Sequence, residues 1–550
     1  MGVAGSPPTS SPVPRRSLGA RTLGALRPSH THTAYTASIL LAASSLLSSV
    51  IGLARGKFIA WLFGAGMQTD AYNAAFRLPD LMSNFLVGGA VSITFVTILN
   101  RYREQGEEPE GERVLFTVLN LMAMVLTAAT LLLMLFARPL VHWLNPGFAA
   151  DELALCTHIT RILLPAQIFL FVGGVLGATL LVRKQFLYQA VTPILYNLSI
   201  IGCGYLLHRR LGISSLAVGA TAGFFFGSML TNALGAARAG VRYRPVFDLR
   251  HPGLRLWLHM TLPLMLGFGL PFLDTFFSGY FASKLTGGIT HLTNAKQLFS
   301  APMAMLTQAA GVASMPFFAQ IWARGKRYEF AVGIADAVSR AVSLGLLAAS
   351  AMIVLAHPIA GLIFGGGRFT ESDVQRTALY FALYTFSLAL WAAQSIYARA
   401  FYAAGITWLP LLASTFIVGL AFPLYWVGFH WYGAAGLALA SDAGIALQAL
   451  TLGLLLHQRR MVSLASLEFA EMGRCLLAGL AAGGVVWFFF VRLFREFAPL
   501  LGEHLVRQAR WIDLAILAAG GLLWLLIANG VLEATGSALP RVMRQRLHRS

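Results

Sequence analysis

Charged side chains within apolar stretches are the residues of this sequence best suited to chemistry. Arg55 lies deep in one apolar run, Asp70 follows it, and Arg77 and Asp80 open the next run on either side of Pro79. An ionised side chain in the bilayer centre costs about 2.5–3.5 kcal/mol on the insertion scale, so each needs a partner, an aqueous cavity or a short path to the interface.

A guanidinium that faces a cavity suits a pyrophosphate, because its planar fork makes charge-assisted bidentate hydrogen bonds. The alternative for Arg55 is a side chain that reaches the membrane interface or pairs with Asp70 or Asp80. We expect pyrophosphate binding at Arg55. For Asp70, Arg77 and Asp80 we expect gating or ion-pair contacts, and for Arg77 the structural role is favoured.

The second half of the chain carries a comparable pair, Asp274 and Lys296. Lys296 is a candidate to bind pyrophosphate, and Asp274 is a candidate for a gating contact or an ion pair. From the residues alone, a purely structural contact is an equal alternative for each.

Motifs of enzymatic catalysis are missing from the sequence. It has no HExxH, no GxSxG, no Walker A loop and no DDxxD-type cluster for metal-bound pyrophosphate. Cys156, Cys203 and Cys475 lie in or beside apolar segments without a CxxC pair, which supports neither a disulfide framework nor a zinc site. We therefore expect no enzyme, no catalytic residue, no metal and no cofactor. Any pumping would use an ion gradient, the membrane potential or later consumption of the cargo, with the coupling ion unknown.

Composition indicates the elements that must position these residues. Of the 550 residues, 57% are hydrophobic and 11% charged, and the mean hydropathy is +0.68, whereas soluble proteins carry about 25% charged residues. The sequence therefore predicts an all-α integral membrane protein. The net charge of +19 comes mostly from Lys and Arg in short breaks between apolar runs, which is typical of cytoplasmic loops and not of nucleic-acid binding.

A helix crosses a bilayer core with about 20 apolar residues, and runs of that length predict about fourteen transmembrane helices. The predicted ranges are 36–63, 75–100, 114–137, 153–182, 187–207, 213–236, 256–283, 294–322, 332–364, 377–403, 408–429, 433–457, 472–494 and 510–532.

The longest connection, about residues 237–255, divides the helices into two lobes of six around a central cavity, with two helices appended. The predicted parts are a disordered basic tail over 1–35, an N-lobe over 36–240, a C-lobe over 241–460, and two helices with a basic tail over 461–550. Lys and Arg are concentrated in one set of connections, which predicts that both termini are cytoplasmic.

Short motifs between Ser48 and Tyr102 resemble those of a known family. They are Ile51-Gly-Leu-Ala-Arg55, Leu62-Phe-Gly-Ala-Gly-Met67, Thr69-Asp70-Ala71, Phe76-Arg77-Leu-Pro79, Gly89-Ala90 and Phe95-Val-Thr-Ile-Leu99, with Pro193-Ile-Leu-Tyr-Asn197, Asp274 and Ala295-Lys-Gln-Leu298 further along. In these motifs the chain is similar to MurJ (MviN), the lipid II flippase family of the MOP exporter superfamily, over nearly its whole length.

The resemblance implies a fourteen-helix transporter with a V-shaped, cationic central cavity. Its cargo would be lipid II, the undecaprenyl-pyrophosphate-linked peptidoglycan precursor, moved from the cytoplasmic to the periplasmic leaflet of the bacterial inner membrane by alternating access. By the same resemblance, Arg55 matches a cavity arginine of the family.

The sequence departs from the family at four positions. Ser49, Ser83 and Gln297 stand where the family often has a functional Arg, and Gly88 stands where an acid is common. Because a charge-assisted hydrogen bond contributes about 1.5–3 kcal/mol, we expect weaker pyrophosphate binding, with Lys296 as a replacement charge.

The expected function is therefore lipid II flipping for peptidoglycan synthesis, with lipid II and the bilayer as partners, the cell-wall machinery as a further candidate partner, and no nucleic acid. The alternatives are export of another polyprenyl-linked saccharide or of a small molecule, a membrane-embedded enzyme, and a scaffold for the cell-wall machinery.

Overall fold

The computed structural model describes residues 34–84, 90–265, 270–311, 315–493 and 509–540. Within these ranges the chain is helical and forms no strand. The predicted basic tails fall almost wholly outside the described residues, as does Gly88.

The first half of the chain forms a series of helices that ends before residue 266. They are α2 (Ala34–Phe63), α3 (Met67–Ala75), α4 (Arg77–Met82), α5 (Ala90–Glu104), α6 (Glu108–Leu135), α7 (Ala137–Leu144), α8 (Ala150–Leu163), α9 (Ala166–Val182), α10 (Leu187–Leu211), α11 (Ser214–Gly223), the π-helix η2 (Phe224–Leu230), α12 (Thr231–Arg238) and α13 (Pro252–Met265).

The second half continues in the same way. Its helices are α14 (Leu270–Ala282), α15 (Gly288–Gly311), α16 (Met315–Ala323), α17 (Arg327–Val354), α18 (Ala356–Phe364), α19 (Glu371–Thr385), α20 (Leu388–Ala403), α21 (Trp408–Gln458), the 3₁₀ turn η3 (Leu464–Ser466), α22 (Phe469–Val486), the π-helix η4 (Trp487–Leu493) and α25 (Ala509–Ala534).

Many of these helices present apolar side chains to the outside. Leu132, Leu454 and Leu526 are 57%, 50% and 63% exposed, which is favourable only where lipid replaces water. Among the described residues, nine helices are long and apolar enough to cross a membrane, or ten if the bent pair α19 and α20 is one span. The protein is therefore a multi-pass membrane protein, and the number fourteen stays a prediction.

The two helices predicted over 408–429 and 433–457 are assigned as the single helix α21, which is 51 residues long. At 1.5 Å per residue this would measure about 75 Å, more than twice the bilayer core. Gly433 resolves the conflict, because its φ of 58° breaks the helical backbone. The backbones of Gly428 and Gly436 then pack closely, so α21 folds back on itself.

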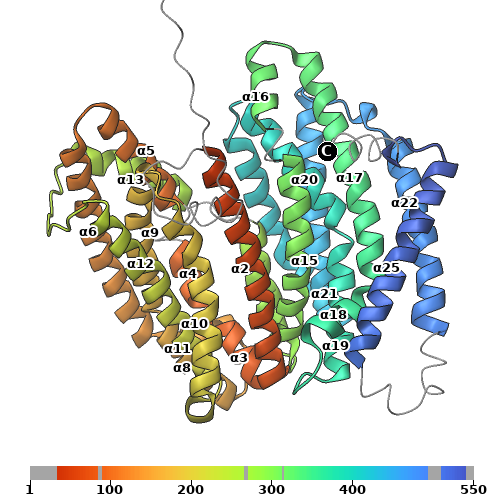
Figure 1. Cartoon of the computed structure of the whole chain (residues 1–550), viewed down its shortest axis with the longest axis horizontal. Coiled ribbons are helices and arrows are strands. Elements are labelled where there is room, and N and C mark those ends of the chain that lie inside the picture. The colour runs from red at the N-terminus through yellow and green to blue at the C-terminus, as the bar shows by residue number, and fades with distance from the viewer. Residues whose placement is uncertain (1–33, 85–89, 266–269, 312–314, 494–508, 541–550) are drawn as a thin grey trace, which may run out of the picture.

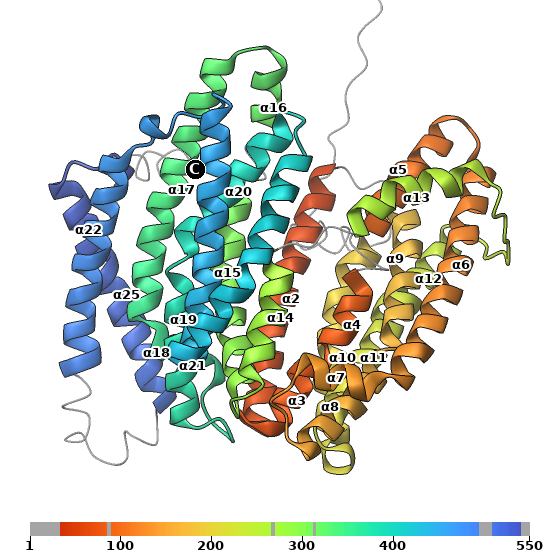
Figure 2. The ribbon, with the colours of Figure 1, turned by 180° about the vertical axis from the view of Figure 1, so that it is seen from behind.

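The helices gather into two groups. Figures 1 and 2 show α5 to α13 on one side, α15 to α25 on the other, and α2, α3 and α14 between them. The helix predicted over 256–283 contributes to both groups, because α13 packs against α5 and α6 while α14 packs against α21. The predicted lobe boundaries therefore stay a prediction.

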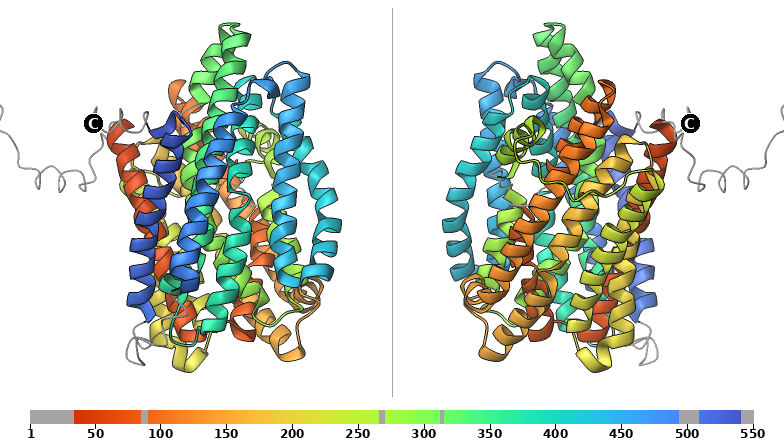
Figure 3. Two further views of the ribbon diagram at one scale, coloured as in Figure 1. Left: turned by 90° about the vertical axis from the view of Figure 1, so that its right-hand side faces the viewer. Right: turned by 90° about the vertical axis from the view of Figure 1, so that its left-hand side faces the viewer.

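The helix bundle has two ends. The near end is where α2 begins and α25 ends, and the far end is where α2 ends and α3 lies (Figures 1 and 3). A buried apolar cluster joins the two groups at the far end; it contains Ala71 of α3, Cys156 of α8, Phe281 of α14 and Leu292 of α15.

Candidate functional site

A polar cavity of about 290 Å³ lies between the two helix groups. Six helices, α2, α3, α4, α10, α14 and α15, contribute to its wall. The lining residues are Arg55, Gly56, Ile59, Ala60, Gly64, Tyr72, Asn73, Phe76, Asp80, Tyr196, Thr275, Thr290, Thr293, Asn294 and Gln297.

Arg55 is the basic residue among the described residues of this wall. It is half-buried, and its guanidinium lies 5.8 Å from the centre of the Tyr196 ring on α10. It forms no ion pair with an acidic residue of the described ranges. The neighbouring Lys57 points elsewhere, donating hydrogen bonds to the Leu362 and Ile363 carbonyls of α18. The Arg55 charge is therefore held by an aromatic ring and stays accessible to an anion.

Asp80 of α4 is the acidic residue of the same wall. Its side chain is exposed although α4 lies inside the molecule, because it faces the cavity. No described Lys, Arg or His lies within ion-pair distance of its carboxylate. The described wall thus carries one positive and one negative charge, and its other polar groups are uncharged.

Asp70 closes the far end and does not pair with an arginine. Its carboxylate accepts hydrogen bonds from the Gly287 N–H at 2.5 Å, the Thr290 N–H at 2.7 Å and the Thr290 hydroxyl at 2.6 Å. It therefore caps the N-terminus of α15, where a negative charge is favourable. Asn73 adds a contact from its amide to the Thr290 hydroxyl at 3.3 Å, so α3 is tied to α15 within the cavity wall.

Arg77 is 4% exposed and also lies at the far end. Its guanidinium donates to the Asn145 side chain at 2.6 Å and to the Leu144 carbonyl at 3.4 Å, at the end of α7. The same group lies directly against Gly279 of α14, where even one Cβ would overlap it. Arg77 is therefore a structural contact that joins α4, the end of α7 and α14, outside the cavity wall.

Lys296 and Asp274 form an ion pair, with Nζ 2.5 Å from a carboxylate oxygen. Tyr425 of α21 and Ser278 of α14 donate to the other carboxylate oxygen, and the Lys296 ammonium lies 5.5 Å from the centre of the Tyr384 ring. The pair thus ties α15 to α14, and Lys296 is not among the described residues of the cavity wall.

The chain is similar to known proteins in sequence and in fold. The sequence profile of the family described as lipid II flippase MurJ matches residues 59–504. The chain belongs to the MurJ family. Arg55 lies just before the matched residues, so its importance rests on its place in the cavity.

Two relatives illustrate the similarity. A probable lipid II flippase MurJ of Vibrio cholerae is 25% identical over 463 residues, covering 82% of this chain and 88% of the relative. The lipid II flippase MurJ of Burkholderia cenocepacia is 26% identical over 434 residues, covering 77% and 84%.

Solved structures share the fold. One described as lipid II flippase MurJ in an inward closed conformation has a TM-score of 0.73 at 21% identity, covering 90% of this chain and 99% of that chain. A MOP superfamily transporter from Pyrococcus furiosus has a TM-score of 0.55 at 14% identity, covering 77% and 95%.

Three of the positions at which the resemblance led us to expect a departure from the family lie in the described part. Gln297 lines the cavity and donates to the Gly52 carbonyl of α2 at 3.1 Å, with its amide against Gly56. Ser49 is exposed on α2 and bonds its own helix at the Ser45 carbonyl. Ser83 follows α4. All three side chains are neutral, so they leave Arg55 as the cation of the described wall.

Several wall residues of this MurJ-family protein were not predicted as site residues from the sequence. Tyr72, Asn73, Tyr196 and Asn294 are uncharged, so their cost within an apolar run is too small to single them out. The available signal was weak: Tyr196 occurs in the motif Pro193-Ile-Leu-Tyr-Asn197, which says nothing about the direction of its side chain.

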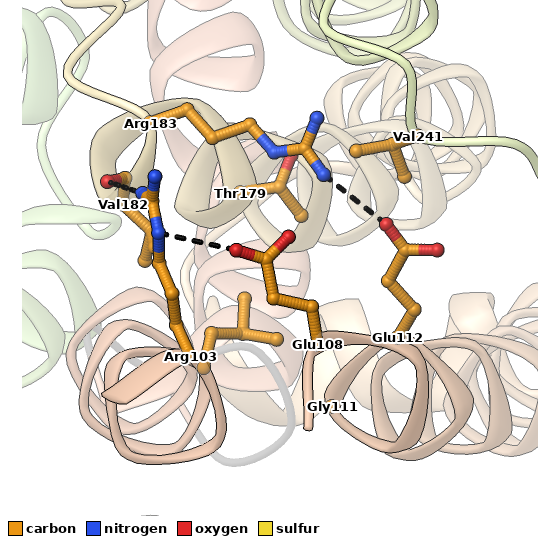
Figure 4. Close-up of a pocket in the computed structure, with 9 residues that line it drawn as sticks. Arg103, Glu108, Gly111, Glu112, Thr179, Val182, Arg183 and Val241 are labelled. Atoms are coloured by element: carbon orange, nitrogen blue, oxygen red, sulfur yellow. Dashed lines mark hydrogen bonds and ion pairs between the residues drawn. The ribbon is translucent and has the colours of Figure 1, made fainter. Parts of the chain in front are cut away.

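A second, smaller pocket of about 40 Å³ lies at the near end. Figure 4 shows that its charges are paired: Arg103 with Glu108 at 3.3 Å and Arg183 with Glu112 at 3.2 Å. These contacts fasten α5 and α9 to α6. No group of three or more possible metal ligands occurs in the described ranges.

Proposed function

We propose that this protein is a lipid II flippase, which moves the undecaprenyl-pyrophosphate-linked peptidoglycan precursor from the cytoplasmic to the periplasmic leaflet for cell-wall synthesis. The observation that carries the proposal is the cavity between the two helix groups of a MurJ-family chain, with Arg55 in its wall and Asp70 closing the far end.

The geometry supports alternating access. A polar headgroup is costly in hydrocarbon, and a polar cavity between helix groups removes that cost while the prenyl chain stays in lipid. For release, the Asp70 and Asn73 contacts at the far end must separate and the near end must close. No covalent step is required, so the protein acts as a transporter and not as an enzyme.

The proposed orientation places the near end in the cytoplasm and both termini on that side of the bacterial inner membrane. The connection between α16 and α17, which carries Arg324 and Lys326, lies at the near end. Basic connections of this kind are retained on the cytoplasmic side during insertion.

Arg55 is the proposed pyrophosphate ligand. Lys296 is a second candidate, which would have to exchange Asp274 for the pyrophosphate. The protein would need no cofactor. We also propose a coupling ion and contacts with the cell-wall machinery, and both rest on the proposed function alone.

Complementation tests this function. We expect the chain to sustain growth, and external accumulation of lipid II, in a bacterium depleted of its own lipid II flippase. The Arg55→Ala variant, present in the membrane at normal abundance, should not. Failure of the wild-type chain despite correct insertion would reject lipid II as the cargo and favour another polyprenyl-linked saccharide, consistent with neutral Ser49, Ser83 and Gln297.

A further inference from the structure

The cavity wall has the composition of a carbohydrate site more than that of an anion site. Its amide side chains are Asn73, Asn294 and Gln297, and it also carries three threonines. Amides and hydroxyls both donate and accept hydrogen bonds, which matches the hydroxyl and N-acetyl groups of a sugar.

Three aromatic rings complete this wall, those of Tyr72, Phe76 and Tyr196. The Tyr72 and Phe76 rings meet edge to face, with centroids 5.2 Å apart. Aromatic rings combine a large apolar face with, in tyrosine, a polar edge. A pyranose ring presents apolar C–H faces and polar edges, so it fits such a wall.

Asp80 distinguishes the two kinds of site. Its carboxylate faces the cavity and has no basic partner within ion-pair distance among the described residues. Such a group repels a pyrophosphate in the same cavity, because like charges in a partly dry space interact strongly. As an acceptor of hydrogen bonds from O–H or N–H groups, however, an ionised carboxylate is stronger than a neutral one.

We propose that this cavity reads the saccharide of the cargo, with Asp80 accepting hydrogen bonds from sugar hydroxyl or N-acetyl N–H groups. Arg55, beside the Tyr196 ring, marks the boundary where the saccharide joins the pyrophosphate. The inference rests on the proposed function, because it takes a polyprenyl-pyrophosphate saccharide as the cargo. It adds that the protein selects this cargo by its sugar.

Binding to the full-length protein in nanodiscs tests this assignment. The probes are undecaprenyl pyrophosphate, which has no sugar, lipid II, and a polyprenyl-pyrophosphate oligosaccharide with different sugars. We expect the wild type to bind lipid II at least tenfold more tightly than undecaprenyl pyrophosphate.

The Asp80→Ala variant should bind lipid II about tenfold more weakly, which is the loss expected for one charge-assisted hydrogen bond. It should bind undecaprenyl pyrophosphate as tightly as the wild type, or more tightly, because a repulsive charge is gone.

The Arg55→Ala variant should bind both lipid II and undecaprenyl pyrophosphate more weakly. Asp151→Ala, which removes an exposed acid at the start of α8, is the matched control and should change neither. Asp80→Asn keeps the shape of the side chain, so an intermediate loss with an unchanged melting temperature would separate recognition from folding.

Equal affinity of the wild type for lipid II and undecaprenyl pyrophosphate would overturn the inference and leave the flippase proposal standing. Equal weakening of both probes by Asp80→Ala, or no change in either, would also overturn it. If the wild type instead prefers the other oligosaccharide and Asp80→Ala abolishes that preference, sugar recognition stands and lipid II is rejected as the cargo.

Discussion

At the scale of residues, charges inside this protein are of two kinds. Lys296 and Asp274 neutralise each other at 2.5 Å, whereas Arg55 and Asp80 face the cavity without an ion-pair partner in the described ranges. An ion pair holds helices together, and an unpaired charge in a cavity is available to a ligand. We therefore assign recognition to Arg55 and Asp80 and cohesion to the α14–α15 pair.

A double-mutant cycle tests this division. Asp274→Asn and Lys296→Met should each lower the stability of the detergent-purified protein by about 1–3 kcal/mol, because the first leaves the partly buried Lys296 and the second the buried Asp274 without its partner. The double variant should recover most of that loss, which thermal unfolding would measure. Strictly additive losses would show that the pair contributes nothing. If Lys296 also binds pyrophosphate, transport stays lost in the double variant although its stability returns.

Some of these residues could be predicted from the sequence and others could not, because only a charge in an apolar run is a strong signal. A charge in an apolar run is rare and costly, so Arg55, Asp274 and Lys296 could be identified as special. The partner of Asp70 could not, because it is the backbone of Gly287 and Thr290, more than 200 residues away in the chain. Neutral wall residues such as Asn73 carry no comparable signal.

At the scale of helices, the contact between α4 and α14 depends on Gly279. Its bare backbone leaves room for the Arg77 guanidinium, which holds Asn145 at the end of α7. Gly279 therefore lets α4, α7 and α14 meet at the far end.

Gly279→Ala should lower stability by about 1–3 kcal/mol and reduce transport, because the new methyl group overlaps the guanidinium and must push α14 away. Gly484→Ala in α22 is the matched control, since nothing lies within 4 Å of its added Cβ. Membrane abundance and melting temperature of the purified variants measure the difference. Equal behaviour of the two variants would contradict the proposed packing.

Helix ranges were predictable where apolar runs end in strong polar or glycine signals. The predicted 187–207 and 510–532 correspond to α10 at Leu187–Leu211 and α25 at Ala509–Ala534. Breaks within an apolar run were not predictable. The single helix predicted over 153–182 is two helices, α8 and α9, which are separated at Pro165. Hydropathy does not change across such a break, so only the backbone restriction of proline indicates it.

At the scale of the whole molecule, alternating access requires the far-end contacts to open. The seal consists of Asp70 on the N-terminus of α15, Asn73 on Thr290, and the Gly147 N–H on the Ser283 hydroxyl at 3.2 Å. These are hydrogen bonds between separate elements, and hydrogen bonds to water can replace them when the far end opens.

A cross-link across this seal should stop transport. Asn73→Cys with Thr290→Cys places two thiols where the side chains already touch, in a chain whose Cys156, Cys203 and Cys475 are replaced by Ser or Ala. We expect oxidation to abolish growth support and a reductant to restore it, while oxidation leaves the activity of either single Cys variant unchanged. Transport that continues in the fully cross-linked protein would exclude opening at this end.

Movement of lipid II itself is the most direct test of the account. Purified protein would be reconstituted in liposomes with dye-labelled lipid II, with and without an imposed membrane potential, and a membrane-impermeant quencher would report the dye that reaches the outer leaflet. The account predicts that, in at least one condition, labelled lipid II reaches the outer leaflet faster with the wild-type protein than in protein-free liposomes. With Arg55→Ala the rate should equal that of protein-free liposomes. The account would be contradicted if the folded wild-type protein gave only the protein-free rate in both conditions.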